Sequence, residues 1–175
     1  MTNKLFKLSV AGFIFVGIIG SLSHFIFEWS GYSRIIGALC PVNESPWEHL
    51  KLILLPYFLW TVIEYFMLKE DNKIFFCKWA GAVSGMAGII IVFYTYSGII
   101  GYSIGIINIL SFFIGVFIAF ATDYFMIKSN RFNKTFYNII GIILFIILFA
   151  VFILFTFAPP LIPLFKDPLS LSYGI

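Results

Sequence analysis

Histidine and glutamate side chains gather in two short stretches of a chain that is otherwise almost entirely apolar. His24 and Glu28 stand four residues apart. Glu44, Glu48 and His49 lie close together in the second stretch. Imidazole and carboxylate groups are common protein ligands of zinc and other divalent metal ions. We therefore expect a divalent-metal site whose candidate ligands are His24, Glu28 and His49. Glu44 and Glu48 are the candidate general bases if that site is catalytic.

These polar residues also have simpler structural explanations. The sequence from Ser45 to Glu48 has the form of a capping box, with serine before the helix, proline at its first position and glutamate three residues after the cap. His24 is harder to explain in this way, because an ionisable group inside an apolar helix is costly unless it is paired or lines a cavity. A hydrogen-bonded pair of His24 and Glu28 is the structural alternative to a metal site. Asn43 is a further polar candidate in the same stretch.

The elements that must position these residues are membrane helices. The chain has 175 residues, of which 61% are hydrophobic and 11% charged, whereas a soluble domain is about a quarter charged. We predict an all-α fold in one membrane domain, residues 1–175, with the lipid bilayer as its surroundings. The net charge of +3 is small, so nucleic-acid binding is not expected. The predicted spans are residues 8–27, 46–68, 75–96, 103–127 and 136–157.

The basic residues predict the orientation of these spans. Eight lysine or arginine residues fall on one side of the predicted bundle and three on the other. The positive-inside rule then places the N-terminus inside and the C-terminus outside, in a multi-pass protein of the cell membrane. This topology puts Cys40 and Cys77 on opposite sides, so they cannot pair. It brings the candidate residues to the outer boundary: His24, Glu28, Glu44, Glu48, His49 and Asp167.

The segment after the fifth span, residues 158–175, contains four prolines and cannot form a sixth span. We expect it to fold back over the outer end and bring Asp167 toward His24 and His49. Another proline, Pro56, lies inside the second span and predicts a kink there.

The opposite end carries two further acids, Glu64 and Asp123. Each lies five residues from a basic residue, Lys69 or Lys128, and snorkelling to the lipid headgroups is one explanation for them. The alternative is a shared proton or cation site, with a polar path continuing along the fourth span through Asn108 and Thr122. On this view the first, second and fourth spans line a polar interior. The third span packs closely through Gly81-x-x-x-Gly85.

Three strings carry a family resemblance. They are H-F-x-F-x-W-S-G from His24, P-V-N-E-S-x-W-E-H-L-K-L from Pro41, and P-L-F-x-D-P from Pro163. Together they resemble a family of small bacterial membrane proteins known only as a domain of unknown function. The resemblance covers the whole chain and implies a polytopic membrane protein, but it supplies no activity.

A second resemblance is much narrower. Ser45 and His49 stand four residues apart, which is similar to the serine and histidine of membrane hydrolases that include the alkaline ceramidases. The H-x-x-x-H pair expected on a late helix is absent, because His24 is the only other histidine.

Three functions fit these observations. A protein that binds or transports a cation or small polar ligand would also use Glu64 and Asp123. A metal-dependent enzyme acting on a lipid or its headgroup at the outer leaflet would not need those acids. An accessory subunit would dock a partner protein through its polar outer face. The P-loop and dinucleotide fingerprints are absent, which argues against an ATPase or a Rossmann enzyme.

Overall fold

The computed structural model describes residues 2–68, 73–132 and 134–175. Apart from an isolated bridge between Lys166 and Tyr173, the regular structure of these residues is helical. Five spans are long and apolar enough to cross a membrane, as predicted, with α3 and α4 together forming the second. The elements are α1 (Thr2–Trp29), α2 (Arg34–Gly37), α3 (Pro46–His49), α4 (Lys51–Leu68), α5 (Ile74–Ile100), α6 (Gly105–Lys128), η1 (Asn130–Phe132), α7 (Thr135–Phe157) and η2 (Pro163–Phe165).

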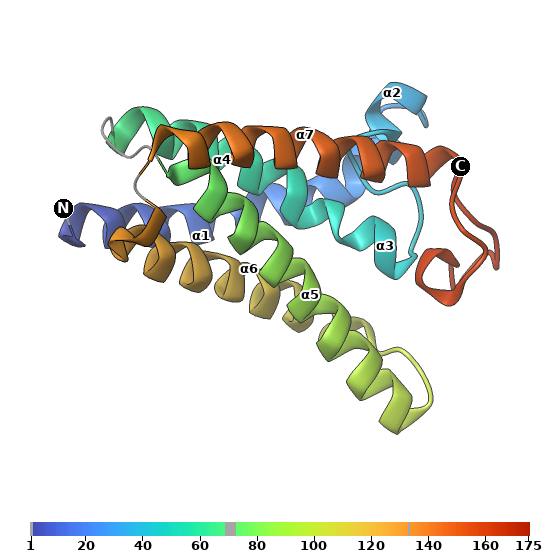
Figure 1. Ribbon diagram of the computed structural model, residues 1–175. Coiled ribbons are helices and arrows are strands. Elements are labelled where there is room, and N and C mark those ends of the chain that lie inside the picture. The colour runs from blue at the N-terminus through green and yellow to red at the C-terminus, as the bar shows by residue number, and fades with distance from the viewer. Residues whose placement is uncertain (1, 69–72, 133) are drawn as a thin grey trace.

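The long helices form an elongated bundle with two distinct ends (Figure 1). We call the end that carries His24, His49 and the C-terminus the histidine end. The other, which carries the N-terminus, Lys78 and η1, is the lysine end. Which end faces the cytoplasm stays a prediction.

Glycines line the most extensive helix contact, between α5 and α6. A Cβ atom added at Gly81 would lie 2.6 Å from the Ala119 carbonyl oxygen, and one added at Gly85 would lie 2.6 Å from the Gly115 carbonyl oxygen. Only glycine therefore allows the two backbones to approach this closely. The predicted packing of the third span through its glycines is confirmed.

The second span is interrupted near its start rather than at its proline. α3 ends at His49 and α4 begins at Lys51, whereas α4 continues through Pro56. Proline has no N–H to donate, so the Leu52 carbonyl one turn earlier lacks its usual helical partner. Gly20 of α1 lies against that oxygen, since a Cβ atom there would be 2.5 Å away.

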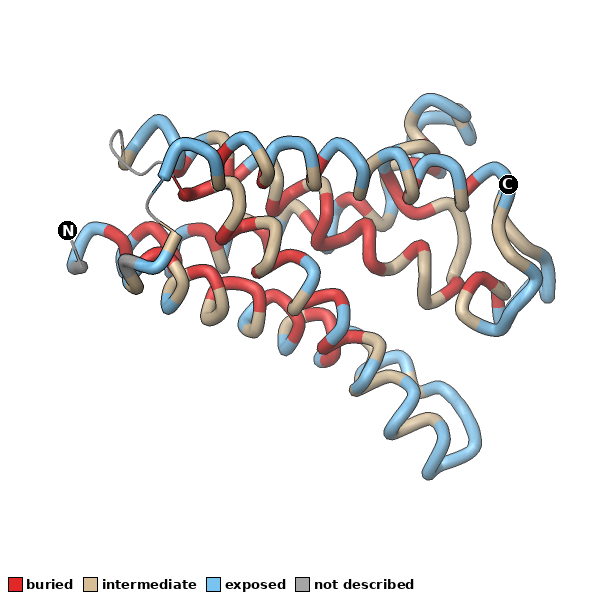
Figure 2. Tube along the Cα trace, viewed as in Figure 1, coloured by how far each residue is buried: buried red, intermediate tan, exposed pale blue. Residues whose placement is uncertain are grey.

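The buried residues lie along the middle of the bundle. Fewer residues are buried in the halves of α5 and α6 nearest their connecting loop (Figure 2). Large apolar side chains such as Ile91, Ile99 and Ile106 are exposed there. Exposed apolar side chains also run along α7. Such surfaces are compatible with contact to the hydrocarbon of a bilayer.

The tail folds back over the histidine end, as predicted. The Trp47 ring of α3 stacks on Phe152 of α7, with centroids 4.2 Å apart, and lies 4.7 Å from the ring of Phe165 in η2. The backbone N–H of Ile175 donates to the Thr156 carbonyl. The tail therefore fixes α3 against the end of α7.

Candidate metal centre

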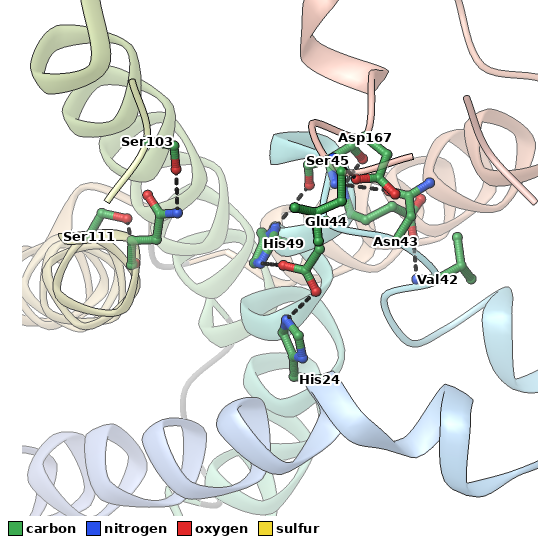
Figure 3. Close-up of polar contacts among 12 residues, drawn as sticks. His24, Val42, Asn43, Glu44, Ser45, His49, Ser103, Ser111 and Asp167 are labelled. Carbon is green, nitrogen blue, oxygen red and sulfur yellow. Dashed lines mark hydrogen bonds and ion pairs between the residues drawn. The ribbon is translucent and has the colours of Figure 1, made fainter. Parts of the chain in front are cut away.

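Three potential metal ligands meet at the histidine end. The Glu44 carboxylate lies between two imidazoles, with Oε1 3.3 Å from His24 Nε2 and Oε2 3.4 Å from His49 Nε2 (Figure 3). Among the described residues, these three side chains form a group whose ligand atoms all lie within 4.8 Å of one another. His24 comes from α1, Glu44 from the loop before α3, and His49 from the end of α3.

The backbone on either side of Glu44 is held by hydrogen bonds. The Ser45 hydroxyl accepts the Glu48 N–H, which makes Ser45 the N-cap of α3, as predicted. The Ser45 N–H donates to Asn43 Oδ1, and Asn43 Nδ2 donates to the Gly174 carbonyl of the tail. Asn43 therefore ties the loop that carries Glu44 to the C-terminal segment.

Glu48 is not the second half of the capping box and is poorly placed to act as a general base. Its side chain is 2% exposed and forms a 2.7 Å ion pair with Lys51. Glu48 Oε2 also accepts the Val42 N–H, and Oε1 accepts the Thr156 hydroxyl. The sequence pattern did not indicate this role, because the Ser45 N–H, which a capping-box glutamate would accept, donates instead to Asn43 Oδ1.

The Glu48 and Lys51 pair clamps the preceding loop onto the bundle. Lys51 Nζ donates to the carbonyls of Gly37 and Cys40, at 2.8 and 3.3 Å. Both charges are buried and satisfied by several partners, which is the condition under which a buried pair is tolerated. The clamp fixes residues on both sides of the segment that delivers Glu44 to the histidines.

The His49 ring is oriented by a backbone carbonyl. His49 Nδ1 lies 3.0 Å from the Ser45 carbonyl oxygen. A carbonyl can only accept, so Nδ1 carries a proton, and Nε2 is the nitrogen that faces Glu44. This is the arrangement typical of metal-binding histidines, whose second nitrogen donates to a carbonyl or carboxylate.

The electrostatics of the site keep Glu44 ionised. When their Nε2 atoms are protonated, hydrogen bonding from His24, and then from His49, holds the pKa of the Glu44 carboxyl well below its ordinary value, while partial burial acts in the opposite direction. A carboxylate rather than a carboxylic acid is the form that binds a cation.

A cavity of about 320 Å³ opens beside this site. Its polar walls are His24, Glu28, Asn43 and Glu44, and the rest of the lining is apolar or aromatic. Glu28 is exposed and lines the cavity but does not belong to the three-residue group, so Glu44 takes the place expected for Glu28. The i, i+4 spacing of His24 and Glu28 does not indicate Glu44, because Glu44 comes from the loop before α3 rather than from α1.

Asp167 does not join the histidines as expected. Its carboxylate accepts the Leu169 N–H at 2.8 Å and the Ser170 hydroxyl at 2.7 Å. These bonds close a turn within the tail.

Asn108 forms its hydrogen bonds with nearby residues. Its side chain bonds to Ser103 and Tyr96 in the region that joins α5 and α6.

A second charged cluster lies at the lysine end. Lys78 Nζ is 2.7 Å from Glu64 Oε2 and 2.6 Å from Asp123 Oδ2, and all three side chains are fully buried. Glu64 and Asp123 therefore do not snorkel to the headgroups. Lys69, the basic residue noted near Glu64, lies outside the described residues. The third span contributes to the polar interior through Lys78, which was not expected.

One sequence signal could have found this cluster. Lys78 lies about one turn inside the third span, at a depth where a cation needs a partner. Lys78 is also one of the eight basic residues that predict the orientation of the spans, and that role alone gives no sign of a buried partner.

Comparison with protein families decides the membership of the chain. A family model described as "Family of unknown function (DUF6512)" matches residues 1–175. The chain belongs to this family. No curated protein and no solved structure gives a significant match. Membership of DUF6512 assigns no activity, so function has to be argued from the two charged sites.

Proposed function

We propose that this member of DUF6512 is a multi-pass protein of the cell membrane that binds one divalent metal ion, of which zinc fits best. The ligands would be His24, Glu44 and His49. The observation that carries the proposal is the Glu44 carboxylate lying between two imidazole Nε2 atoms.

The separations of the donor atoms support this assignment. Zinc bonds to nitrogen or oxygen ligands are about 2.0–2.1 Å long, so tetrahedral geometry puts neighbouring donors about 3.3 Å apart. The two N···O distances are 3.3 and 3.4 Å, one to each oxygen of Glu44, so a single ion would meet this spacing with both carboxylate oxygens turned toward it. Both are longer than most charge-assisted hydrogen bonds, which are about 2.7–2.9 Å.

The tautomer of His49 supports it as well. Because Nδ1 donates to the Ser45 carbonyl, a neutral His49 turns the lone pair of Nε2 toward a carboxylate. A cation between the two groups relieves that repulsion. Protonation of Nε2 is the alternative, and the metal-content experiment described below distinguishes the two.

The number of ligands leaves room for another molecule. Three protein ligands with an open position are typical of catalytic zinc sites, whereas structural sites are closed by four. The adjoining cavity offers that position to a small polar ligand or a lipid headgroup, with the aromatic rings of Phe25, Phe27 and Tyr32 nearby. Binding of such a ligand by the metal ion is the function that the geometry supports best.

A metal-dependent hydrolase is the second candidate, and the position of Glu28 favours it. This exposed carboxylate lines the same cavity without belonging to the ligand group. It could take a proton from a metal-bound water, the part first expected for Glu44 or Glu48. Hydrolysis of a headgroup ester that is lost in Glu28→Gln, with the metal retained, would establish this function.

Transport of the ion through the bundle is supported less well. Ile53, Leu54 and Tyr57 follow the histidine end along α4 and are buried in the apolar core. A transport path from His49 toward Glu64 would have to pass this packed region.

Elemental analysis of detergent-purified protein tests the metal proposal. We expect about one zinc, iron or manganese ion per chain, lost in both His24→Ala and His49→Ala. Asp167→Asn is the matched control, because Asp167 is an acid at the same end that bonds within the tail. Folded wild-type protein without metal, and unable to take up zinc, would overturn the proposal. A co-purifying protein in that case would favour an accessory subunit.

A further inference from the structure

The cluster at the lysine end contains more acid than base. Glu64, Lys78 and Asp123 are all 0% exposed, and one ammonium group faces two carboxyl groups. If every group were ionised, the cluster would carry a net charge of −1 inside the protein. A buried charge without a counter-ion is strongly disfavoured, and titratable groups usually change their protonation to avoid it.

The unused oxygens show where a further ligand could bind. Lys78 contacts Oε2 of Glu64 and Oδ2 of Asp123. The remaining oxygens, Glu64 Oε1 and Asp123 Oδ1, are buried without a hydrogen-bond partner. A buried, unpaired carboxylate oxygen is costly, so each of these atoms is a candidate position for a proton.

Among the described residues around the cluster, none supplies a second positive charge. On α4, the Trp60 indole donates to Glu64 Oε2 at 3.0 Å, and the Tyr57 hydroxyl contacts Asp123 Oδ2. Both donors are neutral at pH 7, and Cys77 of α5 is buried nearby. From α1, Gly12 adjoins the Trp60 ring. The ring of Phe120 on α6 lies 4.6 Å from Lys78 Nζ.

We infer that this cluster is a proton-binding site, which at neutral pH holds one proton shared between Glu64 and Asp123. The bound proton makes the cluster electrically neutral. The site is independent of the proposed metal centre, because it lies at the opposite end of the bundle and uses other residues.

Infrared spectroscopy of the purified protein at pH 7 tests this inference. We expect a carboxylic-acid C=O band that shifts in D₂O. The band should be lost in Glu64→Gln and also in Asp123→Asn, because either change leaves one carboxylate paired with one ammonium group. Glu28→Gln, which removes an exposed acid, should leave the band unchanged. Labelling aspartate or glutamate with ¹³C identifies the acid that carries the proton.

Three results would overturn the inference. The first is the absence of a carboxylic-acid band in the folded wild-type protein, a test that needs no variant. The second is a band that persists in both Glu64→Gln and Asp123→Asn. The third is a band that appears only when sodium is replaced by choline, which would assign the site to a sodium ion.

Discussion

The two ends of the bundle use similar groups in opposite surroundings. At the histidine end, the side chains of His24, Glu44 and His49 are 29%, 39% and 23% exposed beside a cavity. At the lysine end, the side chains of Glu64, Lys78 and Asp123 are all 0% exposed. The first group can exchange an ion with its surroundings, whereas the second is closed.

This difference in access decides what each site can bind. An open site with two imidazoles and a carboxylate suits a hydrated metal ion, which must shed water as it binds. A closed site already filled by a lysine ammonium has room for little more than a proton. The residue types alone do not separate the two sites, because each has carboxylate and nitrogen groups within bonding distance.

The largest effect is expected when the closed cluster loses its cation. Lys78→Met leaves two buried acids without a counter-ion, so we expect a loss of about 3–5 kcal/mol in the free energy of unfolding. Unfolding in mixed detergent, followed by circular dichroism, measures this loss. Lys128→Met, at an exposed lysine in the last turn of α6, is the control and should change stability by less than about 1 kcal/mol. Equal effects in the two variants would contradict the description of a closed site.

Substitutions at the open site are expected to change the affinity for zinc rather than the free energy of unfolding. Glu44→Gln removes the carboxylate between the histidines, so zinc affinity should fall by more than about 100-fold, since loss of even an outer-shell partner costs 10–100-fold. Isothermal titration of metal-free protein with zinc measures the change. Glu28→Gln should weaken binding by less than about tenfold. A larger loss in Glu28→Gln than in Glu44→Gln would reverse the ligand assignment.

A smaller effect is expected at the helix cap that precedes His49. Ser45→Ala removes the side chain that caps α3 and should lower the free energy of unfolding by about 1 kcal/mol. Ser33→Ala is the matched control, because Ser33 precedes α2 without a side-chain capping bond. A thermal unfolding series on both variants makes the comparison. Identical melting temperatures would show that the cap does not stabilise this end.

The smallest effect is expected at Asp167. Asp167→Asn keeps an acceptor oxygen for the turn in the tail and touches neither histidine, so zinc affinity should stay within about twofold of the wild-type value. The same zinc titration is the test. A loss comparable to that of Glu44→Gln would restore Asp167 to the site, as topology had suggested.

The five spans could be predicted because their signal is local. A run of about 20 apolar residues specifies a span wherever it occurs. The boundaries were less accurate: the third span reaches Ile100 rather than residue 96, and it ends where Gly101 takes a left-handed conformation. The capping role of Ser45 was also predictable, because it depends on residues only three positions away.

The partners within each site could not be predicted, because they depend on packing. Glu44 lies in a loop without helical periodicity, and its position depends on the Glu48 and Lys51 clamp and on Asn43 bonding to Gly174. These contacts join residues far apart in the sequence. The depth of Lys78 in its span indicates that it needs a partner. It does not indicate which one, because Glu64 and Asp123 come from other helices.

X-ray absorption at the zinc edge tests the central claim most directly. Zinc-loaded protein should give two imidazole ligands, one carboxylate and one further light atom, all at about 2.0–2.2 Å. Glu44→Gln should lose the carboxylate contribution while the tail variant Asp167→Asn keeps the full spectrum. A shell of oxygen atoms without imidazole, or a spectrum unchanged by Glu44→Gln, would contradict an open metal site at the histidine end.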